Sequence, residues 1–546
     1  MPRVVSRHSQ CLRCLADRAT MRFCFSSSPS FALRQYATFS SKSSHRTILG
    51  TRYHSDDLVI FKNNLRRTLE AHRSSNRTSL VRKVFDRTSL KDFARPPTSK
   101  EEVSVLRSPE KLSSSGAEAQ PVSSVLSTWT ERNPRNLRKG LEKNPRDIPG
   151  DRIRWGISTK IGRWAQSPWM HRWDADRQWS DGFSQLDAEI RALEEYLLPT
   201  PLEQDKVNHI VSEVSSMLRD IIPLAPQVIG SRRSGFAMSH SGLDFILPVP
   251  DPARSSDKVR RPSPSRPHVL DLYSSLLSYV KRTLEQCSSF NGRVELTGKR
   301  NSILTAVHHE TGVRLQFYCG ETLPSSSEYT RDYHAEYPAI RPLYMVVRLI
   351  LDAQELFGSH QSSVGPDTIV MLLVVFLKMN HGRFQNPRSL GEQLLAFLKV
   401  YGSEVDLTST GVSVDPPSFF DADTVKATIK DYEPNALPAY LRGQRALINL
   451  KRTAVAKHNI RAASTLCLQD PANYMNNLGR TCSRTHELQN AFICAYDRLS
   501  ARLGTWERPK CNGLTLNSLL SSALQANFND FSRVRARIVS AGRRCP

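Results

Sequence analysis

The residues best suited to chemistry lie within residues 228–250, which read VIGSRRSGFAMSHSGLDFILPVP. A short apolar run ends in Gly230 and Ser231, a polar turn containing Gly235 follows, and a second apolar run carries Asp244. This order predicts a strand, a turn and a second strand. Such a turn can present backbone N–H groups to a triphosphate while the second strand holds a carboxylate beside it. The stretch therefore predicts a site at which a phosphate-bearing ligand lies next to Asp244.

This stretch resembles the opening motif of the polymerase-beta-like nucleotidyltransferases, and most closely the palm of the mitochondrial and other non-canonical poly(A) polymerases. The family pattern is Gly-Ser, a short turn, and then Ser-Asp-x-Asp followed by apolar residues. Gly230 and Ser231 fit this pattern, but the two aspartate positions fall on Gly242 and Asp244. The third family carboxylate lies on a later strand, where this chain has Gln316. The resemblance implies that two of three metal carboxylates are replaced and that Asp244 is retained.

The replaced carboxylates bear directly on catalysis. Phosphoryl transfer of this kind uses two divalent ions, roughly 3.5 to 4 Å apart, that carboxylates hold in place. Losing one such carboxylate should remove several kcal/mol of transition-state stabilisation. Mg²⁺ or Mn²⁺ is therefore expected as a cofactor only if transfer survives, with Asp244 as its ligand. Asp251 precedes a proline and is predicted to be a turn residue. A histidine could rescue a metal site, but His308 and His309 are predicted to be hairpin residues.

The resemblance continues in the second half of the chain and implies further nucleotide-binding positions. Residues 337–356 match a family helix whose basic residue contacts the triphosphate, and this position falls on Arg348. A second basic position one turn later falls on Asp352, which reverses the charge. Residues 364–378 match a helix that begins Ser-Ser-Tyr, and Asp367 replaces the tyrosine that stacks on the base. Asp367 is predicted to cap this helix instead.

Two later segments match the family's associated domain in order and spacing. Residues 390–420 show the strongest resemblance to this domain. Residues 470–480, DPANYMNNLGR, resemble its nucleotide-recognition loop, with Asn476, Asn477 and Gly479 at the matching positions. The family commonly has Asp where Asn477 stands. The resemblance as a whole covers more than half of the chain.

The elements that position these residues follow from the spacing of apolar side chains. Helices are predicted at residues 183–198, 202–221 and 268–287, and an antiparallel strand pair before Gln316. Alternating helices and mixed strands predict an α+β fold. The resemblance implies a nucleotidyltransferase palm with a mixed β-sheet, followed by a mostly helical poly(A) polymerase-associated domain. The predicted parts are a transit peptide (1–55), a basic, Trp-rich, partly disordered region (56–180), the palm (181–335), the helical domain (336–505) and a basic C-terminal helix or tail (506–546).

Positive charge is concentrated near the N-terminus. The chain has 76 Lys and Arg against 52 Asp and Glu, and residues 1–180 hold 34 of the basic and 16 of the acidic residues, which leaves 42 against 36. The first 55 residues are rich in Arg and Ser and poor in acids, which is typical of a mitochondrial transit peptide; a disordered tail is the alternative. Import into the matrix is therefore expected. No apolar run is long enough to predict a transmembrane helix, and the pair Cys11 and Cys14 lacks the partners of a zinc site.

Aromatic residues accompany the basic ones. Six of the seven tryptophans lie between Trp129 and Trp179, among arginines and lysines. Such side chains can stack on single-stranded bases, and the candidates are Trp155, Trp164, Trp169 and Trp173. The alternative is that this arm packs against the body, because tryptophan buries a large area. The basic C-terminal helix leaves two similar alternatives, which are contact with RNA and a solvated face.

These patterns favour one functional hypothesis over another. The leading hypothesis is a poly(A) polymerase-like protein with a degenerate catalytic site, imported into mitochondria, where it binds single-stranded RNA or a ribonucleoprotein. The second is an active polynucleotide adenylyltransferase that extends RNA 3′ ends with Asp244 and an unrecognised carboxylate as metal ligands. The fold alone does not decide between them.

Overall fold

The computed structural model describes residues 65–74, 153–172, 179–222, 224–249, 267–290, 294–298, 302–320, 325–358, 363–381, 384, 389–433, 436–507 and 517–541. The chain divides into two units, Met1–Phe61 and Lys62–Pro546, and every described residue belongs to the second. The predicted transit peptide, residues 1–55, lies outside the described residues. Among the helices that are described, none has both the length and the apolar character needed to cross a membrane.

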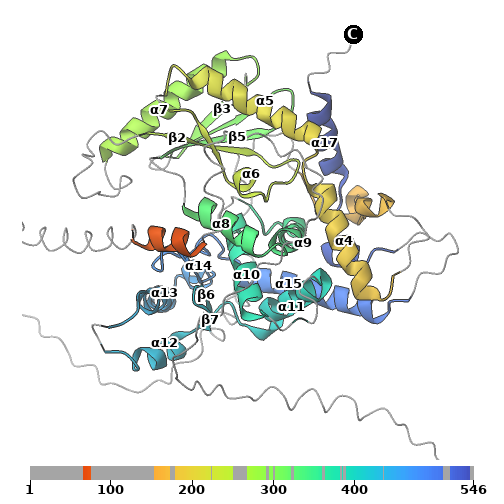
Figure 1. Cartoon of the computed structure of the whole chain (residues 1–546), viewed down its shortest axis with the longest axis vertical. Helices are drawn as coiled ribbons and strands as arrows, with labels where there is room; N and C mark the ends of the chain where they lie inside the picture. Colours follow the sequence, from red (N-terminus) through yellow and green to blue (C-terminus); the bar gives the residue numbers. More distant parts are fainter. Residues whose placement is uncertain are drawn as a thin grey trace, which may run out of the picture. The chain divides into compact units, whose positions relative to one another are not determined.

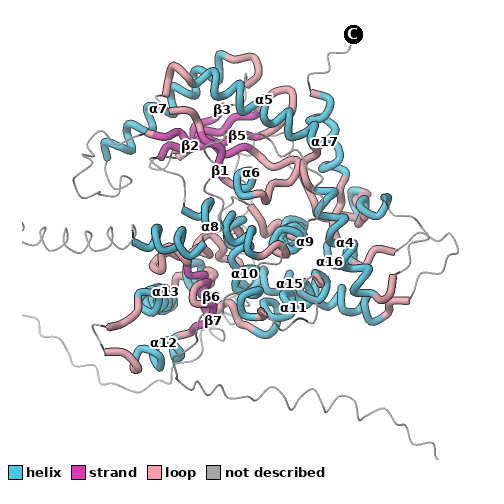
Figure 2. The backbone as a smooth tube through the Cα atoms, in the orientation of Figure 1, coloured by secondary structure: helices cyan, strands magenta, loops and turns pink. Residues whose placement is uncertain are grey.

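A five-stranded mixed sheet forms the core of the predicted palm, in the order β1-β2-β5-β4-β3 (Figure 2). β2 runs parallel to β5, and the other neighbouring strands are antiparallel. The strands are β1 Gln227–Ile229, β2 Leu243–Pro248, β3 Val294–Thr297, β4 Ile303–Val307 and β5 Arg314–Gly320. The prediction of an α+β palm with a mixed sheet is confirmed, although three strands form where the sequence predicts a pair.

Two long helices cover one face of this sheet (Figure 1). α5 Pro201–Leu218 and α7 Pro267–Gln286 bury their apolar faces together with β2 and β5. The rings of Phe245 and Phe317 stack in this core with their centroids 5.2 Å apart. Because side chains alternate along a strand, the residues next to these phenylalanines, Asp244 and Gln316, point to the opposite face.

The first two helices of the body join different cores. α4 Gly182–Leu197 packs into the helical half of the fold, whereas α5 packs on the sheet. Thr200 separates them and begins α5 with a capping box, in which its hydroxyl accepts from the Glu203 N–H and the Glu203 carboxylate accepts from the Thr200 N–H. Such a box satisfies two backbone donors at a helix start. Both helices lie within three residues of the predicted bounds.

The second core is mostly helical and is built largely from α4, α8, α9, α10, α11 and α15. The predicted helices at residues 337–356 and 364–378 are observed as α9 Ile340–Ala353 and α10 Pro366–Met379. α8 Ser325–Glu336 is absent from the predictions, because only Tyr329 and Tyr333 form its apolar face. The remaining helices are α6 Ser231–Ser234, α11 Leu390–Lys399, α12 Ala422–Ile429, α13 Ala439–Ala456, α14 Ile460–Ala463 and α15 Thr485–Gly504, with a π-helical turn at Val400–Glu404.

A small sheet completes this half of the fold. Its order is β7-β6-β8, with β7 antiparallel and β8 parallel to the central strand β6. The strands are β6 Gly411–Val414, β7 Pro417–Phe420 and β8 Leu468–Gln469. β8 leads directly into the predicted nucleotide-recognition loop.

The tryptophan-rich arm is part of the folded body where it is described. It contains two short 3₁₀ helices, Thr159–Ile161 and Pro168–Arg172. Trp155 and Trp169 are buried against Phe528 in the helical core. Of the two alternatives for this arm, Trp155 and Trp169 therefore follow packing against the body and are not available to stack on bases, because their rings are covered by protein. Trp164 is 62% exposed, while Trp173 lies outside the described residues.

The basic C-terminal helix packs one face on the body and leaves the other, which carries Arg533, exposed. It is α17 Asn529–Ser540, preceded by α16 Leu520–Leu524. The Arg535 guanidinium bonds the buried Glu203 carboxylate at 2.6 Å and donates to the carbonyl of Tyr196. Arg537 donates to the carbonyls of His309 and Glu310 at the β4–β5 hairpin. These two arginines therefore hold the tail on the palm.

Replacing the buried arginine of this tail should be costly. Arg535→Ala leaves the Glu203 carboxylate, which is 1% exposed, without its cation, and losing one partner of a buried pair costs about 3–5 kcal/mol. The matched control Arg533→Ala removes an arginine that is 70% exposed and should change stability by less than about 0.5 kcal/mol. Urea-induced unfolding of the purified proteins measures both. Equal stabilities of the two variants would contradict the packing role of Arg535.

Candidate functional site

The turn after β1 has the geometry that the sequence predicts. Gly230 has a φ of 71° and Gly235 a φ of 83°, and α6 forms a single helical turn between them. Glycine reaches these left-handed conformations without a steric penalty. Gly230 also lies directly against the second strand, because a Cβ at this position would be 2.5 Å from Asp244 Oδ2. The turn and the carboxylate are therefore in contact.

The parallel pairing of β2 and β5 brings the family's three metal positions together. Asp244 on β2 lies opposite Gln316 on β5, and Gly242 stands just before β2 begins. A Cβ on Gly242 would be 2.8 Å from the backbone oxygen of Arg314, which is closer than real Cβ atoms approach other heavy atoms. A side chain at position 242 therefore requires β5 to move away.

Asp244 is surrounded by an amide and two guanidinium groups. We orient the Gln316 amide so that its nitrogen donates to Asp244 Oδ1 at 3.2 Å and its oxygen accepts from Arg314 Nη2 at 3.0 Å; this orientation satisfies all of its neighbours. Burial raises the pKa of Asp244 to about 6, while the guanidinium groups of Arg314 and Arg232 act to lower this pKa. Partial neutralisation of Asp244 thus comes from arginines of the chain itself.

A pocket of about 240 Å³ opens beside Asp244. The palm contributes Gly230, Ser231 and Tyr318 to its lining, and the helical half contributes polar residues from α8 and α10. The pocket therefore lies where the sequence predicts a ligand, between the turn and the helical half.

Asp367 is one of these polar residues and does not cap its helix. The N-cap of α10 is Gly365, Pro366 begins the helix, and Asp367 stands in the first turn with its side chain lining the pocket. Burial raises the pKa of Asp367, a hydrogen bond from Ser326 lowers it, and the nearby Asp470 carboxylate raises it further. The cap prediction is wrong because the side chain turns toward the palm.

Arg348 lies away from this pocket. Its guanidinium is 3.3 Å from the Asp352 carboxylate, one turn later on α9, and lies over the ring of Phe357 at 4.6 Å. The reversed charge at Asp352 therefore engages the arginine that the resemblance assigns to the triphosphate. Arg348 is not among the described residues that line the pocket.

The predicted recognition loop is held in shape by the residues singled out in it. Asn477 Oδ1 accepts from the N–H groups of Leu468 and Gly479, both at 2.9 Å, and its Nδ2 donates to the Leu466 carbonyl at 2.8 Å. A carboxylate at position 477 would face that carbonyl without a proton to donate, so the amide suits this loop. Asn476 donates to Asp470 Oδ2 at 2.9 Å.

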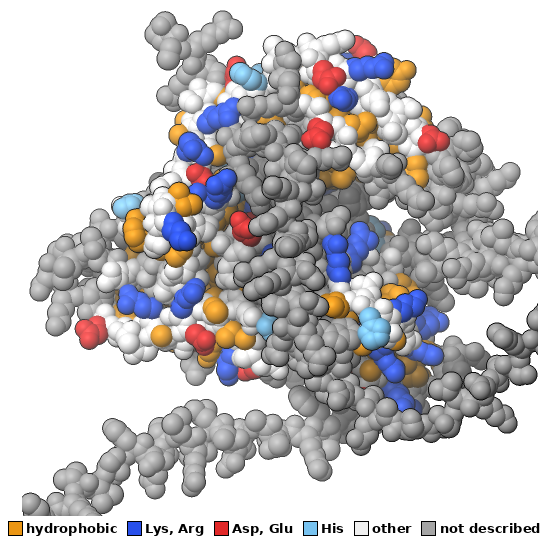
Figure 3. Space-filling model, turned by 180° about the vertical axis from the view of Figure 1, so that it is seen from behind, with side chains coloured by type: hydrophobic (Ala, Val, Ile, Leu, Met, Phe, Trp, Pro, Cys, Tyr) orange, Lys and Arg blue, Asp and Glu red, His pale blue; other side chains and the backbone are white. Residues whose placement is uncertain are grey.

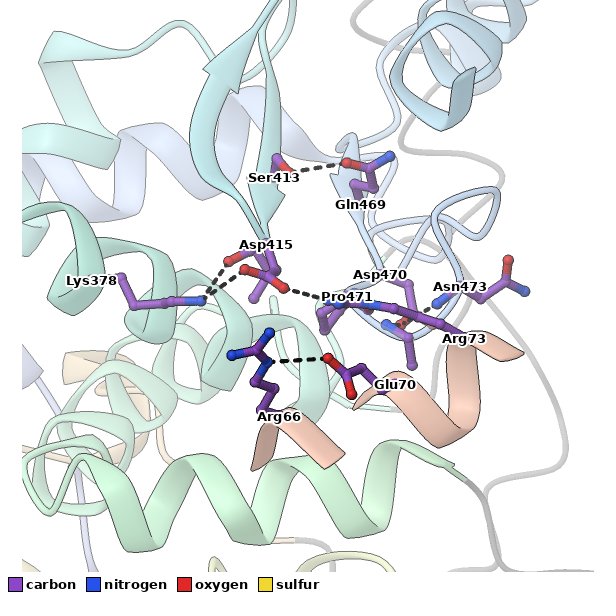
Figure 4. Close-up of polar contacts among 12 residues, drawn as sticks. Arg66, Glu70, Arg73, Lys378, Ser413, Asp415, Gln469, Asp470, Pro471 and Asn473 are labelled. Carbon is purple, nitrogen blue, oxygen red and sulfur yellow. Dashed lines mark hydrogen bonds and ion pairs between the residues drawn. The ribbon is translucent and has the colours of Figure 1, made fainter. Parts of the chain in front are cut away.

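A helix far from this loop in sequence packs against it. Residues 65–74 are helical, and Arg73 donates to the Pro471 carbonyl at 2.8 Å while pairing with Asp415 (Figure 4). Thr68 contacts the Asp332 carboxylate of α8 and His72 contacts the Glu328 carboxylate of α8, each at 2.7 Å. Leu69 is buried in the helical core. The helix therefore joins α8, which lines the pocket, to the recognition loop.

The sequence relatives of this chain include poly(A) RNA polymerases. No protein-family model matches the chain. Poly(A) RNA polymerase protein 1 of Eremothecium gossypii is 23% identical over 386 residues, which cover 69% of this chain and 54% of that protein. Poly(A) RNA polymerase protein 2 of Saccharomyces cerevisiae is 24% identical over 342 residues, which cover 61% of this chain and 51% of that protein. The chain thus matches about half the length of these two relatives.

The chain is thus similar in sequence to poly(A) RNA polymerases. Among solved structures, the polymerase core of TRAMP, an RNA surveillance complex, is similar with a TM-score of 0.49 and 18% identity, covering 66% of this chain and 99% of that chain. The Cid1 poly(U) polymerase is similar with a TM-score of 0.42 and 13% identity, covering 58% of this chain and 94% of that chain.

The residues present do not fit the two-metal site that the poly(A) polymerase resemblance implies. Of the three carboxylate positions, only Asp244 offers a carboxylate, and the amide of Gln316 donates to it. Within the part of the chain that the structure describes, no group of three or more His, Cys, Asp or Glu could hold a metal ion. His308 does not restore a site, because it is buried in the β4–β5 hairpin and its Nδ1 is bonded to Thr311.

Two features of this poly(A) polymerase-like site escape the sequence patterns. α8 brings Ser326 and Thr330 to the pocket, yet its polar sequence has no regular apolar stripe. Helix 65–74 falls in the region predicted to be basic and partly disordered, and its contacts with α8, across more than 250 residues, leave no local signal. Its local clue is the pair Leu65 and Leu69, two apolar residues one turn apart within a basic helix.

Proposed function

We propose that this chain is a poly(A) polymerase-like protein that has lost nucleotidyl transfer and binds RNA or a ribonucleoprotein in mitochondria. The observation that carries this proposal is the contact set of Asp244. The Gln316 amide donates to Asp244 from one position where the family places a metal-binding carboxylate, Gly242 offers no ligand at the other, and the Arg314 guanidinium bonds the Gln316 amide oxygen. Charge neutralisation by positioned metal ions supplies most of the catalysis in phosphoryl transfer, so this arrangement supports binding without chemistry.

A transfer assay tests this proposal. We expect the purified protein to add no labelled nucleotide to an RNA 3′ end with Mg²⁺ or Mn²⁺ and any of the four nucleoside triphosphates, because only one carboxylate remains to hold the metal ions. Asp244→Ala should leave this result unchanged. Transfer that Asp244→Ala abolishes would establish an active adenylyltransferase instead. Restoring Gly242→Asp with Gln316→Asp is a poor rescue, because the Arg314 backbone leaves no room at position 242.

The proposed RNA contact is best tested at Trp164. Lys and Arg side chains are spread over the face in Figure 3 with acidic side chains between them. In the described part of the arm, Arg154, Lys160 and Trp164 are all exposed. Removing residues 56–180 would delete Trp155 and Trp169 from the core, so a single substitution is the cleaner experiment.

Trp164→Ala should weaken binding to single-stranded RNA by about 1–3 kcal/mol, which is on the order of 5- to 150-fold, because one stacked base is lost. Binding to duplex RNA should change much less. Tyr279→Ala, at an aromatic residue that is 61% exposed on α7, is the matched control and should have no effect. Fluorescence anisotropy at fixed salt measures the affinities. An equal loss of affinity for single-stranded and duplex RNA would contradict base stacking by Trp164.

The mitochondrial part of the proposal rests on the composition of residues 1–55. A basic, Ser-rich stretch poor in acids is imported as a matrix-targeting sequence. Residues 1–60 fused to a fluorescent reporter should therefore co-localise with a mitochondrial marker, and a fusion in which the arginines of this stretch are replaced by glutamine should not. A cytosolic or nuclear signal from the unaltered fusion would overturn this location.

A further inference from the structure

The pocket beside Asp244 has an acidic lining without a basic counterpart. Asp244 lines it from β2 and Asp367 lines it from α10. Of the described residues that form its lining, none is Lys or Arg. The carboxylate of Asp244 also lies over the turn at Gly230, where the motif would receive a phosphate. An anionic ligand would therefore meet two carboxylates in a partly desolvated site, where like charges repel most strongly.

Among the described residues that act on the Asp367 carboxylate, none is a cation. Its pKa is raised by burial, lowered by the Ser326 hydroxyl and raised by Asp470. The pKa of Asp470 is likewise raised by burial, and hydrogen bonds from Asn476 and from backbone N–H groups oppose that effect. Asp244, in contrast, has Arg314 and Arg232 nearby. The helical side of the pocket is thus the side on which a positive charge is missing.

A second, independent feature of the pocket points to a ligand. Thr330 on α8 lines the pocket and is only 2% exposed, and its hydroxyl has no hydrogen-bond partner within the described structure. Leaving a buried hydroxyl unsatisfied costs free energy, and buried polar groups normally have a partner. A ligand that donates hydrogen bonds would satisfy Thr330 and the two carboxylates together.

The remaining lining suits an aliphatic chain. Ile229 and Phe236 from the palm side and Pro366 and Val370 from α10 supply apolar surface. The pocket volume of about 240 Å³ is below the roughly 300–1,000 Å³ of sites for drug-sized ligands. The space therefore matches a small molecule or a single long side chain.

We propose that this pocket binds a small organic cation, an alkylguanidinium or alkylammonium group, in place of a nucleoside triphosphate. The cationic head donates to the carboxylates of Asp367 and Asp244 and to the hydroxyl of Thr330, and the alkyl stem packs on the apolar lining. This inference rests on the proposed loss of the metal site, because bound metal ions would reverse the charge of the pocket. The same chemistry is offered by a free amine and by the Arg or Lys side chain of a protein.

Isothermal titration of the full-length protein with agmatine tests this inference. We expect saturable binding of agmatine, and no competition from ATP with or without Mg²⁺. Asp367→Asn should weaken agmatine binding by about tenfold or more, because a hydrogen bond to a charged group is lost. Asp423→Asn is the matched control, since Asp423 is an exposed aspartate in the first turn of α12, and it should leave the affinity unchanged.

Thr330→Val removes the hydroxyl and keeps the shape of the side chain, so it provides a second variant if Asp367→Asn fails to fold. We expect a loss of about threefold to tenfold in agmatine affinity from one neutral hydrogen bond. A Gly-Ser peptide with one central arginine separates the two sources of the cation: tighter binding than agmatine indicates a protein side chain, and weaker binding indicates a free amine. Both results support the cationic site.

Several results would overturn the inference. These are no agmatine binding at millimolar concentration, unchanged affinity in both Asp367→Asn and Thr330→Val, and displacement of agmatine by ATP with Mg²⁺. The transfer assay on the same preparation distinguishes a failure of the cationic site from a failure of the proposed function. Absence of both transfer and agmatine binding rejects the cationic site alone, whereas nucleotide transfer rejects the proposed function itself.

Discussion

The parallel pairing of β2 with β5 is the constraint on which the site depends. Phe245 and Phe317 stack on the face covered by α5 and α7, so Asp244 and Gln316 must point to the other face. A shift of register by one residue would exchange the two faces and would place a carboxylate in the apolar core. The same pairing brings the Arg314 backbone against Gly242. The positions, charges and free space of the site therefore follow from one ladder of backbone hydrogen bonds.

The sequence predicts those parts of the fold that local physics determines. Glycines at the turn and apolar spacing in the helices each act within a few residues, and the structure has both. Trp155 and Trp164 show where this reasoning stops. Both lie among basic residues, yet Trp155 is covered by Phe528 and Phe531 from the other end of the chain, and Trp164 is not. When residues far away in the sequence bury a side chain, the sequence around that side chain has no pattern that predicts its burial.

The candidate site shows the same division. The contact between the Gly230 turn and Asp244 is predictable, because both belong to one short motif. The placement of Asp367 in the pocket and of Arg348 against Asp352 depends on how α8, α9 and α10 pack. Neither the cap preference of an aspartate nor the match of a basic residue to a family position contains that information.

Counting charges in a sequence overstates how many are available to a partner. Arg535 and Arg73 both appear as part of a basic surplus, but each is engaged by a carboxylate and a backbone carbonyl of the same chain. Arg163 in the tryptophan-rich arm is engaged by Asp530 in the same way. Arginine suits these positions because its planar fork can bond two acceptors at once. Part of the excess of basic residues therefore holds helix 65–74, the tryptophan-rich arm and α17 against the body.

Helix 65–74 has a consequence for how this protein can mature. Leu69 belongs to the same buried core as α8 and α10, and Arg73 supports the Pro471 carbonyl. A processing protease that cut after this helix would release a buried side chain and expose the core beneath it. If a leader is removed, the scissile bond must therefore precede Leu65. A chain that is cut after this helix would lose the contacts of Leu69 and Arg73 and would be less stable than a chain that is cut before it.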